Sequence, residues 1–197
     1  MKTLVHFLKY QLGLARAETS VTKAEWDCMA SHASGRRCLV EIGVWHGATT
    51  CRLRKVMASD GILYAVDPYP VGRLGISMPR QIALCEVGRV LNARVEWVRE
   101  TGADAARGLA AKLVGRAEFV FIDGDHSYDG LRADWEGWSE LVAPGGLIAL
   151  HDSRSSPVRP IDNAGSVRFT TEVILADPRY QVAETIDSLT VLRRRPP

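Results

Sequence analysis

Two segments of the chain carry acidic and histidine side chains at a spacing that could support catalysis. An apolar run is followed at once by Asp123, Asp125 and His126, and a second apolar run ends in His151 and Asp152. Carboxylates and imidazoles bind divalent metal ions and exchange protons near neutral pH. If the two runs are adjacent parallel strands, about 4.8 Å apart, these side chains can converge on one cation or one reacting hydroxyl.

A third segment joins a short apolar stretch to a helical one through a glycine loop. Glu41 and Gly43 lead into this turn, and Trp45 and Gly47 lie within it. Glycines let the backbone turn tightly and approach a nucleotide-like ligand, although such loops are also common as plain turns. Asp67 closes the next apolar run, where an acid can accept hydrogen bonds from both hydroxyls of a ribose. A solvated loop acid is the alternative for this position.

Alternating strands and helices must position these residues. Apolar runs predict strands over residues 38–42, 62–66, 95–99, 118–122 and 147–151. Helical spacing of apolar residues predicts helices over residues 47–58, 79–92, 103–114 and 127–142. Strict alternation implies a parallel sheet that right-handed crossovers cover on both faces.

The end of the chain departs from this alternation. A helix is predicted over 167–176, and strands are predicted over 180–186 and 189–194. Only Asp187 and Ser188 separate the two strands, so they must pair antiparallel.

The beginning of the chain predicts two further helices. Apolar residues on one face predict an amphipathic helix over residues 1–14, which would pack on the core or on another subunit. Thr22 and Glu25 form a capping-box pattern that starts a second helix. We expect residues 1–35 to be N-terminal helices packed on the core and residues 36–197 to form the rest of a single domain.

Composition narrows the classes of partner. The net charge of +2 argues against a nucleic-acid-binding face, with Arg193 to Arg195 interpreted as a solvated basic end. No stretch approaches the roughly 20 apolar residues of a membrane span. The four cysteines form no Cys-x-x-Cys pair, which fits a reducing cytoplasm.

Over about residues 38–195, the chain resembles the class I S-adenosylmethionine-dependent methyltransferases. The matching features are the loop from Glu41 to Gly47, Asp67, the segment 98–103, Pro144-Gly145-Gly146 and the terminal hairpin. The resemblance implies an α/β, Rossmann-like, doubly wound fold with a mostly parallel seven-stranded sheet that ends in an antiparallel hairpin. It also implies that S-adenosylmethionine contacts Glu41, Gly43, Trp45, Gly47, Asp67, Thr101, Gly102, Ala103 and Asp123.

The segments around residues 123 and 151 resemble the metal-dependent small-molecule O-methyltransferases, including the sugar and antibiotic-tailoring branches. The resemblance implies that Asp123, His151 and Asp152 bind a divalent cation. At position 151 this chain has His where an acid is commoner, and a neutral His suits Mn²⁺, Fe²⁺, Co²⁺ or Zn²⁺ better than Mg²⁺. A hydrogen-bonded cluster without a metal is the alternative.

The resulting prediction is methyl transfer to a hydroxyl of a small molecule. His126 is the first candidate for the base and Asp125 the second, with Asp123 beside them. One rival is an NAD-type oxidoreductase, which would need Gly-x-Gly-x-x-Gly, whereas this chain has Trp45 and Ala48 at the second and third glycine positions. The other is a non-catalytic cofactor-binding partner subunit. A homo-oligomer that associates through the N-terminal helix is also predicted.

Overall fold

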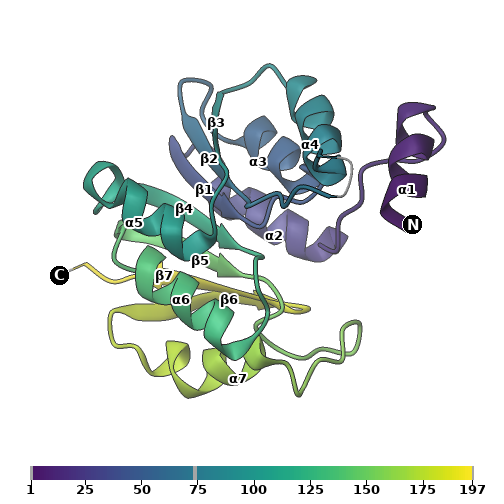
Figure 1. The fold of residues 1–197 in the computed structure, drawn as a ribbon. Helices are drawn as coiled ribbons and strands as arrows, with labels where there is room; N and C mark the ends of the chain where they lie inside the picture. The colour runs from purple at the N-terminus through teal and green to yellow at the C-terminus, as the bar shows by residue number, and fades with distance from the viewer. Residues whose placement is uncertain (1, 73–74, 197) are drawn as a thin grey trace.

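A seven-stranded sheet forms the centre of the computed structural model, which describes residues 2–72 and 75–196 (Figure 1). The strand order is β3-β2-β1-β4-β5-β7-β6. The strands are β1 (Cys38–Ile42), β2 (Ile62–Val66), β3 (Arg94–Val98), β4 (Ala117–Ile122), β5 (Val142–Leu150), β6 (Tyr180–Ile186) and β7 (Leu189–Arg194). Strands β1 to β5 are parallel, and β7 is antiparallel to both β5 and β6. The predicted fold class is therefore confirmed.

Helices cover both faces of the sheet (Figure 1). They are α1 (Lys2–Gln11), α2 (Lys23–Ala33), α3 (Ala48–Val56), α4 (Met78–Gly88), α5 (Gly102–Leu113), α6 (Tyr128–Trp138) and α7 (Gly165–Glu172), followed by the 3-10 helix η1 (Ile174–Ala176). Buried residues of α2, α3 and α4 form one apolar core with Leu39 and Phe119, and those of α5, α6 and α7 form a second with Val40 and Val120. The alternation of side chains along each buried strand thus supplies both cores.

The loops after β1 and β4 meet closely. Gly43 has a φ of +88°, and a Cβ built on it would lie 2.0 Å from the carbonyl oxygen of Asp123. Only glycine satisfies both conditions at this position. Because β1 lies between β2 and β4, the crossovers diverge here and leave a crevice at the carboxyl ends of the strands.

Strand β5 begins earlier than predicted. The sequence predicts a helix as far as residue 142 and a strand from 147, whereas α6 ends at Trp138 and β5 starts at Val142. Ala117 pairs with Val142, and the next pair is Phe119 with Leu147, so the extra residues of β5 form an irregularity in the sheet. The local sequence Pro144-Gly145-Gly146 predicts a turn, whereas these residues belong to β5 because of its pairing with β4.

The two N-terminal helices differ in how they pack. Helix α2 has the predicted capping box, and its Met29 and Ala33 are fully buried. Helix α1 lies apart from the sheet beside α4 (Figure 1), and its Tyr10 hydroxyl donates a 2.6 Å hydrogen bond to Glu86. The apolar face of α1 stays exposed, with Leu8 at 52% of its full accessibility, so this face is not packed on the core. Across residues 2–72 and 75–196, no helix combines the length and apolar character needed to cross a membrane.

Candidate active site

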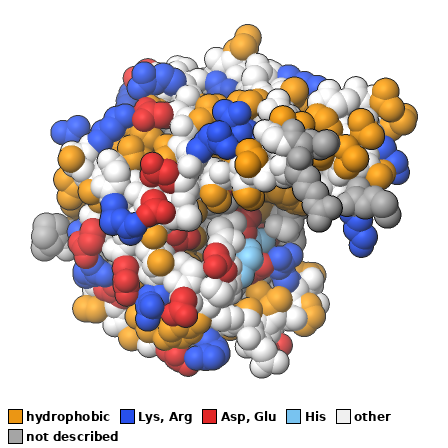
Figure 2. Space-filling view, in the orientation of Figure 1, with side chains coloured by type: hydrophobic (Ala, Val, Ile, Leu, Met, Phe, Trp, Pro, Cys, Tyr) orange, Lys and Arg blue, Asp and Glu red, His pale blue; other side chains and the backbone are white. Residues whose placement is uncertain are grey.

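A cavity of about 610 Å³ opens at the carboxyl ends of the central strands. Its volume is within the range of small-molecule and cofactor sites. In the space-filling view this face is hollowed, with histidine and acidic side chains at the edge of the hollow (Figure 2). The predicted residues that line the cavity are Gly43, Trp45, Asp67, Thr101, Gly102, Ala103, Asp123, Asp125 and His126.

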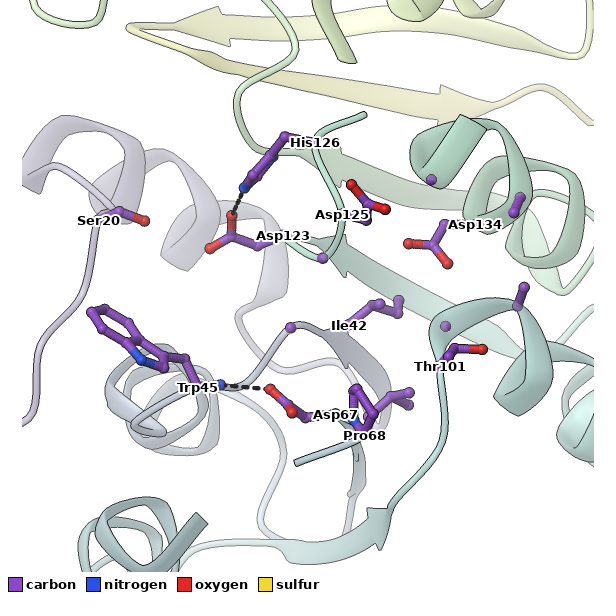
Figure 3. A pocket seen from close by; sticks show the side chains of 17 residues that line it. Ser20, Ile42, Trp45, Asp67, Pro68, Thr101, Asp123, Asp125, His126 and Asp134 are labelled. Atoms are coloured by element: carbon purple, nitrogen blue, oxygen red, sulfur yellow. Dashed lines mark hydrogen bonds and ion pairs between the residues drawn. The ribbon is translucent and has the colours of Figure 1, made fainter. Parts of the chain in front are cut away.

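Asp67 organises the glycine loop at one side of this cavity (Figure 3). Its Oδ2 accepts hydrogen bonds from the backbone N–H groups of Val44 (3.1 Å) and Trp45 (2.9 Å), and its Oδ1 accepts one from Tyr69 (2.8 Å). Trp45 has a φ of +49°, a left-handed conformation that costs a non-glycine residue free energy. The Asp67 carboxylate, which also lines the cavity, therefore holds a strained loop.

Glu41 and Gly47 support the loop from behind and do not line the cavity. Glu41 is fully buried and accepts a 2.5 Å hydrogen bond from the Thr50 hydroxyl of α3. Burial, with a smaller contribution from the neighbouring Asp123 and Asp67, raises the pKa of Glu41 to about 8. A Cβ on Gly47 would meet Val87 and Ala83 of α4 at 3.0 and 3.2 Å, so this glycine lets α3 and α4 pack closely.

The opposite end of the cavity is formed by the start of α5. Thr101 caps this helix, since its hydroxyl oxygen accepts a 3.2 Å hydrogen bond from the N–H of Asp104. Trp138 of α6 donates a 3.0 Å hydrogen bond from Nε1 to the carbonyl oxygen of Gly102. Trp135 and Trp138 are both buried, which agrees with a packing role.

The predicted acidic and histidine residues meet at the rim between β4 and β5. Nδ1 of His151 lies 2.8 Å from Oδ1 of Asp123 and 3.6 Å from Oδ1 of Asp152. Nε2 of His126 lies 3.5 Å from Oδ1 of Asp123 and 3.8 Å from Oδ2 of Asp152. Asp123 and His126 line the cavity, whereas His151 and Asp152 are buried behind them. Asp125 lines the cavity separately and accepts a 2.8 Å hydrogen bond from the N–H of Ser127.

This geometry fits a metal ion. Two ligand atoms bound to one ion at about 2.1 Å lie roughly 3 to 3.5 Å apart, which is close to the observed separations. One ligand atom each from Asp123, His126 and His151 fall within 4.8 Å of one another. Oδ1 of Asp152 is buried and accepts no hydrogen bond of good geometry from the described residues, but Nε of Arg159 forms an ion pair with it.

Glu25 of α2 completes the surroundings of His151, although the sequence marked it only as a helix cap. Its Oε2 lies 3.4 Å from Nε2 of His151, and its Oε1 accepts hydrogen bonds from the N–H (2.9 Å) and hydroxyl (2.6 Å) of Ser188. Burial alone would lower the pKa of His151, but Asp123 and Glu25 outweigh it and raise this pKa to about 10. No local pattern could have paired Glu25 with a residue 126 positions away.

Arg159 and Asp134 are two further residues of the site that the motifs did not assign. Arg159 donates a 2.5 Å hydrogen bond from its guanidinium group to Oδ2 of Asp152. Asp152 has a φ of +50°, so the ion pair holds a strained backbone. Asp134 of α6 lines the cavity beside Gly102. In the sequence it reads as one acid among several on a helix.

Comparisons with solved structures show the same fold. A protein from Corynebacterium glutamicum is 17% identical, with a TM-score of 0.71 over 100% of this chain and 91% of that one. An O-methyltransferase from Bacillus cereus in complex with SAH is 22% identical, with a TM-score of 0.65 over 98% and 91% of the two chains. The cofactor-bound Rv0187 from MTB is 17% identical, with a TM-score of 0.69 over 100% and 91%.

A family model described as a methyltransferase domain matches residues 40–153, which is more than half of the chain. The matched residues run from the glycine loop to the end of β5 and include the predicted cofactor and metal ligands. The chain therefore belongs to the methyltransferase-domain family, and the predicted enzyme class, an S-adenosylmethionine-dependent methyltransferase, is confirmed.

Proposed function

We propose that this methyltransferase transfers the methyl group of S-adenosylmethionine to a hydroxyl group of a small molecule and uses a divalent metal ion. The observation that carries the proposal is the position of Asp123. Its carboxylate lines the cavity and also lies close to His126 and His151, so a base or a metal ion at this rim would lie beside a methyl donor bound in the cavity.

The lining residues suggest how the cofactor lies. The methionine part would contact Gly43 and Trp45, the ribose hydroxyls would donate to Asp67, and the adenine would lie along Thr101 to Ala103. Oδ1 of Asp67 accepts only one hydrogen bond from the described residues and so retains a free lone pair. Glu41 and Gly47 would act indirectly, by fixing the loop.

Methyl transfer is an in-line displacement. The acceptor oxygen forms a bond to the methyl carbon, the carbon–sulfur bond breaks, and S-adenosylhomocysteine leaves with the electron pair. Alignment of donor and acceptor can be worth an effective molarity of roughly 10⁵ to 10⁸ M. His126 would take the hydroxyl proton, a contribution of about 10² to 10⁴ in rate. Asp123 and Asp152 would stabilise the resulting imidazolium from 3.5 and 3.8 Å.

Asp123, His151 and Asp152 are the proposed ligands of the divalent ion. When bound, such an ion lowers the pKa of a coordinated hydroxyl and orients it. His151 must give up a proton to ligate through Nδ1, and Glu25 would then accept a hydrogen bond from Nε2, as carboxylates commonly do for metal-bound histidines. Mn²⁺, Fe²⁺, Co²⁺ and Zn²⁺ are the ions that this ligand set favours.

Metal binding is tested by titrating chelator-treated protein with Mn²⁺ and following free Mn²⁺ by electron paramagnetic resonance. We expect one bound ion per chain, lost in Asp123→Asn and retained in Asp125→Asn, a matched change in the same loop. No binding of Mn²⁺, together with full activity in EDTA, would contradict the metal proposal. The site would then be a metal-free hydrogen-bonded cluster in which His151 and Arg159 supply the positive charge.

The acceptor class is tested with S-adenosylmethionine that carries a labelled methyl group. The enzyme is incubated with pairs of small molecules that differ only in a hydroxyl or an amine at one position. Label on the hydroxyl partners supports O-methylation. Label on the amines alone, or on RNA added as a competitor, would contradict it.

Two further expectations concern the setting of the enzyme. The exposed Leu8 of α1, with the exposed Leu12 just after this helix, supports the proposal that the chain forms a homo-oligomer through the helix. Sedimentation of the wild type and of Leu8→Lys would show association that the substitution abolishes, whereas a monomeric wild type would contradict the proposal. The four free cysteines support a reducing compartment such as the cytoplasm.

A further inference from the structure

Asp134 of α6 is a buried acid without a partner among residues 2–72 and 75–196. Asp134 is 5% exposed, and its side chain lines the cofactor cavity. It has no hydrogen bond or ion pair with any residue of the described ranges. The other buried acids in those ranges, Glu25, Glu41 and Asp152, each have a hydrogen-bond partner. Among the buried carboxyl groups that the structure describes, Asp134 is therefore the exception.

Burying a carboxyl group without a partner costs free energy. Burial, with a smaller contribution from Asp125, raises the pKa of Asp134 to about 7. An alanine or leucine at this position of α6 would avoid the cost. A side chain that lowers the stability of the empty protein and faces a binding cavity is expected to serve the ligand.

The position of Asp134 limits which part of the ligand it can contact. Its carboxylate lies against the start of α5, because a Cβ built on Gly102 would be 2.1 Å from Oδ1. A Cβ on Gly124 would be 3.2 Å from Oδ2. The two glycines thus leave room for this carboxylate. Figure 3 shows Asp134 and Thr101 at one end of the cavity and Trp45 at the other.

We infer that Asp134 accepts a hydrogen bond from the exocyclic amino group of the cofactor's adenine and so selects this base, an inference that rests on the proposed orientation of S-adenosylmethionine. The cofactor offers three kinds of hydrogen-bond donor: the amino group of its methionine part, the ribose hydroxyls and the adenine amino group. The first two face Trp45 and Asp67 in that orientation. The adenine amino group is the donor left for Asp134, and carboxyl oxygens are acceptors suited to it.

The experiment compares two ligands by isothermal titration calorimetry. One is S-adenosylhomocysteine, and the other is its analogue with an oxo group in place of the adenine amino group. Both are titrated into the wild type, Asp134→Ala and Asp134→Asn. The control is Asp129→Ala, which changes an exposed acid on the same helix.

We expect Asp134→Ala to lower the affinity for S-adenosylhomocysteine about 10- to 100-fold and to leave the affinity for the oxo analogue unchanged. The preference for adenine would then disappear. Asp134→Asn brings an amide donor that can pair with the oxo group, so its preference should shift toward the analogue. The melting temperature of ligand-free Asp134→Ala should not fall, because Asp134 has no partner to lose among the described residues. Asp129→Ala should behave as the wild type in all assays.

An equal loss of affinity for both ligands in Asp134→Ala would overturn the inference. Asp134 would then only shape the cavity, or the cofactor would bind in the opposite orientation. Wild-type protein that binds both ligands equally well would overturn it too, while leaving the proposed cofactor site intact. Absence of binding of S-adenosylhomocysteine to the wild type would instead remove the proposed cofactor function itself. The asparagine variant provides the same comparison if the alanine variant fails to fold.

Discussion

Substitution of Glu41 by Gln should remove part of the pH dependence of the free energy of unfolding. Glu41 is fully buried, its Oε1 has no hydrogen-bond partner among the described residues, and its pKa is raised from 4.5 to about 8. The folded protein therefore holds a proton on Glu41 that the unfolded chain loses above pH 4.5. A raised carboxyl pKa means that stability falls as the pH rises from 4.5 to 8 and then levels off.

The size of this effect follows from the pKa shift. At 1.36 kcal/mol per pH unit, a shift from 4.5 to about 8 corresponds to at most about 5 kcal/mol. Gln cannot ionise, and its amide oxygen can still accept the hydrogen bond from Thr50. The free energy of unfolding of Glu41→Gln, relative to the wild type, should therefore increase by several kcal/mol between pH 5 and pH 9.

Urea unfolding in EDTA, followed by circular dichroism across this pH range, measures the difference directly. EDTA removes any metal bound near Asp123, whose charge contributes to the raised pKa. Parallel pH profiles for the two proteins would refute the reasoning, because Glu41 would then ionise alike in the folded and unfolded chains.

Three other substitutions test separate parts of the site. Gly43→Ala should lower the free energy of unfolding by about 1 to 3 kcal/mol more than Gly145→Ala, because its Cβ would collide with the carbonyl of Asp123. Gly145 is the control, since it has a similar positive φ but open space around it. Equal losses in urea unfolding would contradict the proposed close approach. Glu25→Gln should lower the free energy of unfolding by about 3 to 5 kcal/mol above pH 5. Because hydrogen bonds outweigh burial and lower the pKa of Glu25 to about 2, this loss should shrink as the pH falls from 4.5 toward 2. A loss that does not depend on pH in the same assay would contradict the ion pair. His126→Ala should lower kcat by about 10² to 10⁴ without changing the affinity for S-adenosylhomocysteine, and an unchanged kcat would assign the proton to another group.

The order of the elements was predictable because apolar periodicity is a local signal. Strands β1, β2, β6 and β7 have the predicted bounds. The start of β5 was not predictable, since it depends on pairing with β4 across an irregularity. The apolar face of α1 was recognised, but its exposure depends on where the helix lies relative to the sheet.

Some residues of the site were likewise predictable from local sequence, and others depend on contacts between distant segments. Asp67, Asp123 and His126 follow strands directly, so their position at the cavity could be read from the alternation of elements. Glu25 and Asp134 lie on helices, and their roles arise from contacts that form only when the helices pack. Their sequence contexts, a capping box and an ordinary helical acid, give no sign of a cavity.

The central claim is that the cavity between the loops after β1 and β4 binds S-adenosylmethionine. Isothermal titration of the wild type with S-adenosylhomocysteine tests it most directly, with Asp67→Ala as the matched variant. We expect one molecule bound per chain, with the affinity weakened at least 10-fold in Asp67→Ala because the glycine loop loses its anchor and the ribose its acceptor. Absence of binding to the wild type, or equal binding to both proteins, would contradict the assignment of this cavity.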